Sequence, residues 1–132
     1  MAPSPIRLLG IFESGDYDGA DGMEAQFAPG AVIMQWLGKK APGTFTPAVL
    51  KAHLMGSGGA VTGRPEYKNV RRYGGAGFFV EQHTVHFPHG HKSIRNSTTE
   101  AVLVFRLDEQ TGKIVRLDEF LHAKDVAFTP RL

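Results

Sequence analysis

The sequence predicts a single α+β domain over residues 1–132, in which a cone-shaped, curved antiparallel sheet wraps around three helices from the N-terminal half. Two observations lead to this fold class. Capping residues followed by proline, together with apolar residues at helical spacing, occur in the first part of the chain and are typical of helices. From Tyr67 onward apolar and polar residues alternate with a period of two, which is typical of strands.

Three helices are expected, each with a start or a stop signal. The first and the third begin at Ser4-Pro5 and Thr46-Pro47, because proline after a capping residue favours the first turn of a helix, and both end at a glycine. The second is stopped by Pro29-Gly30. The expected helical ranges are residues 4–15, 18–27 and 46–56.

Five strands are expected, and the last four form a meander. The connections between those four are short and rich in turn residues, so consecutive strands should be antiparallel neighbours. A sheet that curls around helices leaves a cone with an open end, where a small ligand can bind. The loop at residues 39–43 is placed at the mouth of that cone. The expected strand ranges are residues 31–37, 67–73, 78–87, 93–107 and 113–122.

Composition excludes several function classes. Fifteen Lys and Arg against thirteen Asp and Glu leave a formal charge of +2, and scattered basic residues argue against a nucleic-acid partner. Because cysteine is absent, the chain has no disulfide, no thiolate nucleophile and no sulfur ligand for zinc. No apolar run reaches membrane-spanning length and the first residues lack the apolar core of a signal peptide, so a cytoplasmic protein without a membrane partner is expected.

Two adjacent carboxylates, Asp118 and Glu119, lie near the end of the last strand. Because successive strand residues point to opposite faces, one of them must face whatever the sheet covers. If Glu119 faces inward with Leu117 and Leu121, desolvation raises its pKa toward the range useful for proton transfer. Asp118 then points outward with Arg116. The competing interpretation is that both carboxylates are solvated or paired with neighbours such as Arg116.

Four histidines, His83, His86, His89 and His91, fall within nine residues. Imidazole is a common metal ligand, but His83 and His86 are separated by an odd number of residues and face opposite sides of a regular strand. The other two flank Gly90 in an expected turn, where exposure to solvent is the simpler explanation. The sequence therefore predicts neither a metal nor another cofactor, and leaves one strand histidine as a possible proton carrier.

Three passages resemble the nuclear transport factor 2-like superfamily, and the resemblance extends over nearly the whole chain. They are the Gly15-Asp16-Tyr17-Asp18 turn, the passage Phe27-Ala28-Pro29-Gly30-Ala31-Val32, and Phe105-Arg106-Leu107 through Lys113-Ile114-Val115 into Glu119-Phe120-Leu121. The chain is most similar to the small-molecule branch, which contains SnoaL-like polyketide cyclases, ketosteroid isomerases and limonene epoxide hydrolases. This resemblance implies the cone-shaped fold and, because many members of the branch are homodimers, a homodimer.

At most positions that the resemblance aligns with known catalytic groups, this chain has a residue of a different type. The three acid–base positions of the isomerases correspond to Leu8, Gln35 and Leu103, which argues against ketosteroid isomerisation. The three positions with which the epoxide hydrolases activate water correspond to Gln82, Thr84 and Glu119. The acid/base position of the cyclases also corresponds to Glu119. Glu119 is therefore the catalytic candidate common to two of the patterns.

The register of the strand at 78–87 stays open on sequence alone. The epoxide hydrolase resemblance places Gln82 and Thr84 inside the cone, together with Val80 and His86. The opposite register places Glu81, His83 and Val85 inside, with Phe79 and Phe87. Gln35 shares a face with Ile33 and Leu37, where an amide can orient a ligand carbonyl or hydroxyl, and Trp36 falls on the other face.

The function predicted from these observations is a cofactor-independent enzyme acting on a hydrophobic, oxygenated small molecule. Its reaction is an isomerisation, cyclisation, dehydration or hydration by general acid/base chemistry. The alternative is a noncatalytic ligand-binding or dimerisation module of the same fold. The candidate catalytic residues are Glu119 with His86 or His83, and the candidate substrate contacts are Ile33, Gln35, Gln82, Thr84, Leu103 and Leu117.

Overall fold

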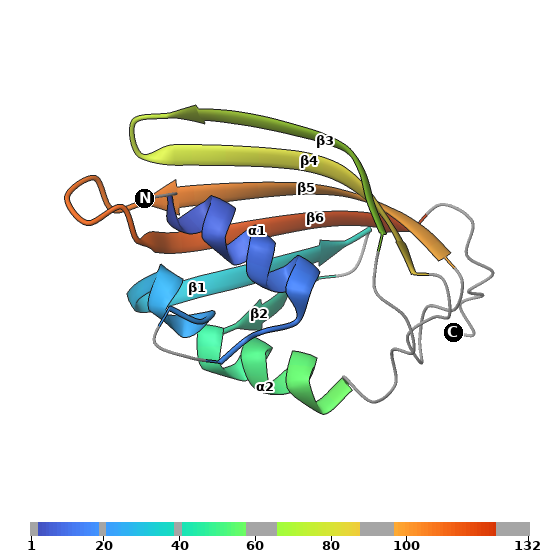
Figure 1. The fold of residues 1–132 in the computed structure, drawn as a ribbon, viewed down its shortest axis with the longest axis horizontal. Helices are drawn as coiled ribbons and strands as arrows, with labels where there is room; N and C mark the ends of the chain where they lie inside the picture. The colour runs from blue at the N-terminus through green and yellow to red at the C-terminus, as the bar shows by residue number, and fades with distance from the viewer. Residues whose placement is uncertain (1–2, 19–20, 39–40, 58–65, 88–96, 124–132) are drawn as a thin grey trace.

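The computed structural model of the chain describes residues 3–18, 21–38, 41–57, 66–87 and 97–123 (Figure 1). Within these residues lie two α-helices, one short 3-10 helix and six strands. The helices are α1 (Ser4–Ser14), η1 (Glu24–Gln26) and α2 (Pro47–Ser57). The strands are β1 (Phe27–Leu37), β2 (Gly43–Phe45), β3 (Glu66–Gly75), β4 (Phe78–Phe87), β5 (Ser97–Leu107) and β6 (Ile114–Ala123).

The six strands form one open, curved sheet in the order β2-β1-β6-β5-β4-β3 (Figure 1). The predicted meander is confirmed, since β3, β4, β5 and β6 are consecutive antiparallel neighbours. The prediction of a wholly antiparallel sheet is wrong, because β1 pairs with β6 in parallel. These two strands are far apart in the sequence, so no turn between them enforces an antiparallel arrangement. Strand β2 was not predicted, and it includes Gly43 of the expected loop.

The two helices with a proline start signal are confirmed, although Pro3 and not Ser4 is the N-cap of α1, and α2 extends past the expected stop at Gly56 to Ser57. Helix α1 has proline in its first turn and ends at Gly15, whose φ of 78° is left-handed and whose amide donates to Ile11 O at 2.8 Å. At the start of α2, the hydroxyl of Thr46 accepts a hydrogen bond from the Val49 amide at 3.1 Å. In both places a local sequence signal sets the helix boundary.

The second predicted helix is wrong. In place of a helix over 18–27, the described residues form only η1, and β1 already begins at Phe27. A Cβ on Gly22 would lie 2.7 Å from Tyr17 O, so this segment folds back closely on itself. Pro29-Gly30 lies inside β1 instead of before it, because the register shift between Phe27 and Val32 accommodates Gly30 at a φ of 76°.

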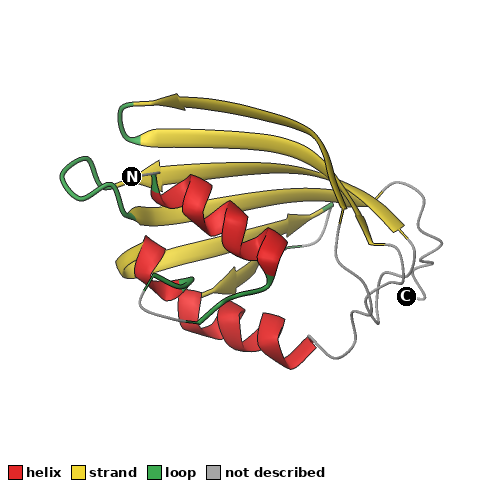
Figure 2. Cartoon of the chain, in the orientation of Figure 1, coloured by secondary structure: helices red, strands yellow, loops and turns green. Residues whose placement is uncertain are grey.

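One face of the sheet, called here the inner face, packs against the helices, and α1 crosses it (Figure 2). Leu8 and Leu9 of α1 and Leu50 of α2 belong to the same buried cluster as the sheet residues. The inner face carries Ile33, Gln35, Phe79, Glu81, His83, Val85, Ala101, Leu103, Phe105, Leu117 and Glu119.

No helix among the described residues is long and apolar enough to cross a membrane.

Candidate functional site

Glu119 lies on the inner face of β6 and is only 9% exposed. The sheet register sets its neighbours, with Gln35 of β1 on one side and Leu103 of β5 on the other. Along β6 the adjacent inner-face residue is Leu117, which is fully buried. The predicted inward orientation of Glu119 is therefore confirmed, and its surroundings are largely apolar.

The carboxyl of Glu119 is poorly stabilised as an anion. Burial raises its pKa from 4.5 to about 7, although a hydrogen bond with Gln35 and the charge of His83 act in the opposite direction. Its Oε1 atom is buried and has no hydrogen-bond partner among the residues that the structure describes. A buried polar atom without a partner is costly in a folded protein, so this oxygen is suited to meeting a polar atom of a ligand.

The structure fixes the register of β4. Glu81, His83 and Val85 are buried on the inner face, and Glu81 pairs with Leu103, which in turn pairs with Glu119. The sequence analysis left this register open, and the alternative with Glu81 and His83 inside is the one observed.

The candidates Gln82, Thr84 and His86 therefore do not lie beside Glu119. They face the opposite side of the sheet, where Gln82 is exposed and His86 Nδ1 lies 3.1 Å from Thr98 Oγ1. The one-residue difference between the two registers moves every side chain of the strand to the other face. Of the two histidine candidates, only His83 shares a face with Glu119.

Glu81 and His83 form a buried polar pair on β4. His83 Nδ1 lies 2.5 Å from Glu81 Oε1, and Arg72 Nε of β3 donates to Glu81 Oε2 at 2.7 Å. Burial raises the pKa of Glu81, but the hydrogen bonds and charges of His83 and Arg72 outweigh it and hold that pKa below its usual value. The inner face thus carries two buried carboxyls, Glu81 and Glu119, whose environments shift their pKa values in opposite directions. This pattern is found in active sites where one group acts as the acid and another as the base.

Tyr67 of β3 joins the group through a β-bulge. Tyr67 pairs with Val85 and Arg72 pairs with Glu81, although Tyr67 and Arg72 are five residues apart and would face opposite sides of a regular strand. The register shift between Lys68 and Arg71 brings both onto the inner face.

The ring of Tyr67 meets the ring of His83 edge-on, with centroids 4.9 Å apart. Burial, followed by the negative charges of nearby acidic groups, raises the pKa of Tyr67, so its phenol stays neutral and can donate a hydrogen bond. Neither Tyr67 nor Arg72 was a site candidate in the sequence analysis. Asn69 is the sequence signal that could have indicated the bulge, because asparagine adopts a left-handed conformation more readily than most residues. Its φ here is 56°.

The remaining predicted substrate contacts separate into two groups. Gln35 and Leu103 flank Glu119 directly. Ile33 and Leu117 are fully buried and pair with each other next to Phe105, within the cluster that contacts the helices. Leu103 is 2% exposed and belongs to the same buried cluster, so all three apolar candidates are part of the hydrophobic core, and their contact with a substrate stays a prediction.

Asp118 faces outward, as expected for the neighbour of an inward Glu119. It accepts hydrogen bonds from Arg116 Nε at 2.8 Å and from Trp36 Nε1 at 3.0 Å, and the bond from Arg116 is the main reason that its pKa is lowered. Trp36 and Phe120 stack with centroids 5.8 Å apart on the same face. Asp118 is therefore a paired structural carboxylate, which is the role that the sequence analysis considered for both acids.

The histidine cluster does not assemble in the described part of the chain. His83 and His86 occupy opposite faces of β4, and His89 and His91 lie outside the described residues. Among residues that are described, no group of three or more His, Asp or Glu side chains is arranged to hold a metal ion.

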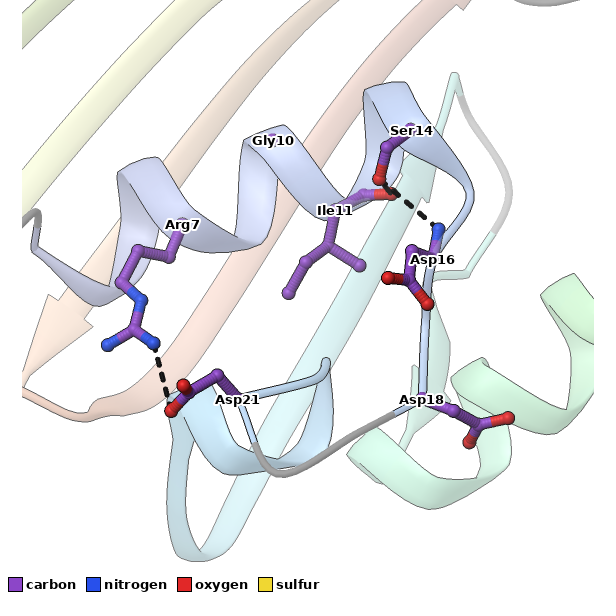
Figure 3. Close-up of a pocket in the computed structure, with 7 residues that line it drawn as sticks. All are labelled: Arg7, Gly10, Ile11, Ser14, Asp16, Asp18 and Asp21. Atoms are coloured by element: carbon purple, nitrogen blue, oxygen red, sulfur yellow. Dashed lines mark hydrogen bonds and ion pairs between the residues drawn. The ribbon is translucent and has the colours of Figure 1, made fainter.

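An open depression of about 430 Å³ lies on the outer side of α1, and Figure 3 shows the residues that line it. Within it, Arg7 forms an ion pair with Asp21 at 3.0 Å, and the Asp21 side chain is 80% exposed. The depression shares no residue with the group around Glu119. We place the candidate site at Glu119, because a buried carboxyl whose oxygen has no partner among the described residues is a stronger sign of ligand binding than exposed, solvated charges.

No protein-family model matches the chain, and no curated protein matches its sequence significantly. Solved structures are similar in fold. A candidate SnoaL-like polyketide cyclase from Shewanella putrefaciens CN-32 has a TM-score of 0.68 and 13% identity, over 89% of this chain and 77% of that one. An NTF2-like protein of unknown function from Cytophaga hutchinsonii ATCC 33406 has a TM-score of 0.62 and 7% identity, over 90% and 87%. An LEH-like epoxide hydrolase from M. tuberculosis has a TM-score of 0.61 and 13% identity, over 90% and 80%.

Proposed function

We propose that this chain, which has the nuclear transport factor 2-like fold, is a small-molecule enzyme in which Glu119 exchanges a proton with the substrate. The observation that carries the proposal is the buried Glu119 carboxyl, which has a pKa of about 7 and an Oε1 atom without a hydrogen-bond partner in the described part of the chain. A group with this pKa is present in both protonation states near neutral pH, so it can act as acid or base. A positioned group of this kind contributes on the order of a hundred- to ten-thousandfold in rate.

The neighbours of Glu119 supply the other parts of such a site. His83 shares the inner face and is close enough for its charge to lower the pKa of Glu119, so it is the partner for a second proton transfer. Gln35 and Tyr67 can donate hydrogen bonds to a carbonyl or hydroxyl of the substrate. Leu103 and Ala101 provide apolar contact between the polar groups.

The substrate class follows from these side chains. Glu81 already accepts hydrogen bonds from Arg72 and His83, so its charge is balanced within the protein. We therefore propose a neutral, hydrophobic and oxygenated substrate, and an isomerisation, cyclisation, dehydration or hydration that requires proton transfer. Two solved structures with this fold have the names of small-molecule enzymes, a candidate SnoaL-like polyketide cyclase and an LEH-like epoxide hydrolase, which supports this class.

A comparison of the wild type with Glu119→Gln tests the proposal. Three compound classes should be screened: β,γ-unsaturated ketones, β-hydroxy ketones and epoxides. For any compound that is turned over, we expect Glu119→Gln to lower kcat by at least a hundredfold while binding, measured by calorimetry, changes little. Glu109→Gln is the matched control, because the same change is made on an exposed turn residue.

Two outcomes would contradict the proposal. Undiminished turnover in Glu119→Gln would remove Glu119 from the chemistry. Compounds that bind to the inner face of both proteins without being converted would favour the noncatalytic ligand-binding module.

Homodimerisation and a cytoplasmic location stay predictions. The sheet face opposite the inner face exposes three large aromatic side chains, Tyr73, Phe78 and Phe120, at 55%, 45% and 44%. Exposed apolar surface of this kind is consistent with contact to a second copy of the chain. Analytical ultracentrifugation at several concentrations would show whether the chain is a dimer.

A further inference from the structure

Glu81 connects two donors that come from different strands. Its side chain is 2% exposed, one oxygen lies 2.5 Å from His83 Nδ1, and the other accepts from Arg72 Nε at 2.7 Å. Both oxygens therefore have a partner, whereas Oε1 of Glu119 has none among the residues that the structure describes. The proposed function gives no role to Glu81 or Arg72, although a buried carboxylate with two such partners is costly to build.

The hydrogen-bond pattern determines which nitrogen of His83 carries a hydrogen. Arg72 and His83 hold the pKa of Glu81 below its usual value, so Glu81 is ionised at neutral pH and can only accept hydrogen bonds. The short contact to His83 Nδ1 then requires a hydrogen on Nδ1, whether the ring is neutral or charged. In the neutral ring the lone pair is consequently on Nε2.

We propose that Glu81 is a positioning residue that, anchored by Arg72, keeps a hydrogen on His83 Nδ1 and makes Nε2 the nitrogen that exchanges a proton. When Nε2 accepts a proton from a substrate, imidazole becomes imidazolium and Glu81 remains ionised. When Nε2 returns the proton, the ring is neutral again with the same tautomer. The catalytic meaning of this inference rests on the proposed function, in which His83 is the partner of Glu119.

The bulge in β3 is what allows Arg72 to anchor Glu81. Lys68 pairs with Thr84 and Arg71 pairs with Gln82, so β3 advances by three residues where β4 advances by two. The bulge therefore contains one extra residue of β3. Without this extra residue, a strand that keeps Tyr67 on the inner face would place Arg72 on the other face. The Arg72 side chain, 36% exposed, reaches the buried carboxylate from the edge of the sheet.

Other ionisable groups also face His83. Tyr67 of β3 contacts the imidazole ring, and Glu119 of β6 interacts with it electrostatically. The neighbour across on β5 is Ala101, which does not titrate. Since Glu119, His83 and Glu81 interact, the pH profile of the site belongs to the group as a whole.

Nitrogen-15 NMR of histidine-labelled protein tests the proposal without a substrate. The His83 signals are assigned by their loss in His83→Gln. At a pH where His83 is neutral, we expect a pyrrole-like shift for Nδ1 and a pyridine-like shift for Nε2, with a strongly deshielded Nδ1 proton. A hydrogen on Nε2 of neutral His83 in the wild type would overturn the proposal.

Two variants test the roles of Glu81 and Arg72. In Glu81→Gln an amide replaces the carboxylate, and we expect the deshielded Nδ1 proton to disappear and the fixed tautomer to be lost. In Arg72→Met we expect that proton signal to move upfield, because Glu81 loses its anchor. Arg71→Met is the matched control, since Arg71 is exposed and pairs with Gln82 on the other face. Unchanged His83 shifts in both Glu81→Gln and Arg72→Met would contradict the positioning role.

Kinetics separate this inference from the proposed function. Once a substrate is known, Glu81→Gln should lower kcat by about ten- to a hundredfold, as for other residues that orient a functional histidine, and should shift the pH profile with little change in KM. If Glu119→Gln leaves turnover intact while the His83 tautomer is as described, the proposed function fails and the positioning of His83 stands. If Glu119→Gln abolishes turnover and Glu81→Gln changes neither turnover nor tautomer, the positioning role fails alone.

Discussion

Replacing Glu119 by Gln should remove a pH-dependent loss of stability that the buried carboxyl causes. Burial raises the pKa of Glu119 from 4.5 to about 7. Between these pH values the folded chain holds a proton that the unfolded chain has released. Because the folded state binds more protons, the free energy of unfolding falls as the pH rises through this window and levels off above it. At about 1.4 kcal/mol for each pH unit, the loss is about 3 kcal/mol.

Urea unfolding followed by the fluorescence of Trp36 measures this effect. The glutamine side chain does not ionise, so the free energy of unfolding of Glu119→Gln minus that of the wild type should rise by about 3 kcal/mol between about pH 4.5 and pH 8. Groups that do not interact with Glu119 contribute equally to both proteins and cancel in the difference, which therefore reports Glu119 together with the residues coupled to it. Glu109→Gln, on the exposed turn, is the matched control for the substitution itself. A difference for Glu119→Gln that is constant within about 0.5 kcal/mol would refute the assignment of a strongly raised pKa.

Three further predictions concern the core and the two faces of the sheet. Phe105→Ala should lower the free energy of unfolding by about 3–5 kcal/mol, because Phe105 is completely buried; a loss below about 1 kcal/mol in urea unfolding would contradict its place in the core. Asp118→Asn should cost about 1 kcal/mol or less in the same assay, since its partner Arg116 is partly exposed, and a cost above about 3 kcal/mol would show that the pair is more than a surface contact. His83→Ala should reduce turnover of an identified substrate while His86→Ala leaves it unchanged, and equal losses would argue against the inner-face site.

The parts of the fold that were predictable depend on local signals. The proline start signal and the terminal glycine define α1 through residues that are close in sequence. The short connections from β3 to β4 and from β5 to β6 favour antiparallel pairing in the same way, whereas the segment between β4 and β5, residues 88–96, lies outside the described residues. Strand alternation predicted that one of Asp118 and Glu119 faces inward, and the resemblance to the cyclases and epoxide hydrolases selected Glu119.

The parts that were missed depend on contacts between distant residues or on special backbone conformations. Nothing in the segment around Phe27 indicates that β1 will pair with β6 in parallel, since that pairing joins residues such as Gln35 and Glu119. The predicted helix over 18–27 relied on apolar spacing, whereas glycine lowers helix propensity and Gly22 is needed for a close backbone approach to Tyr17.

The missed site residues have a similar explanation. On β4 both faces mix polar and apolar residues, so alternation alone could not decide between Gln82 and Glu81 as the inward side chain. On β3 the bulge shifts the alternation between Tyr67 and Arg72 by one residue. The network around His83 is therefore visible only when the pairing partners of both strands are known.

Both edges of the open sheet are poor templates for the addition of a strand from another molecule. At one edge β2 has three residues, and at the other β3 has a bulge at Asn69 and carries Lys68 and Arg71. Long, flat and uncharged edges are where amyloid-like growth begins, and short or charged and bent edges resist it. The bulge that brings Arg72 to Glu81 therefore also protects the folded chain against aggregation.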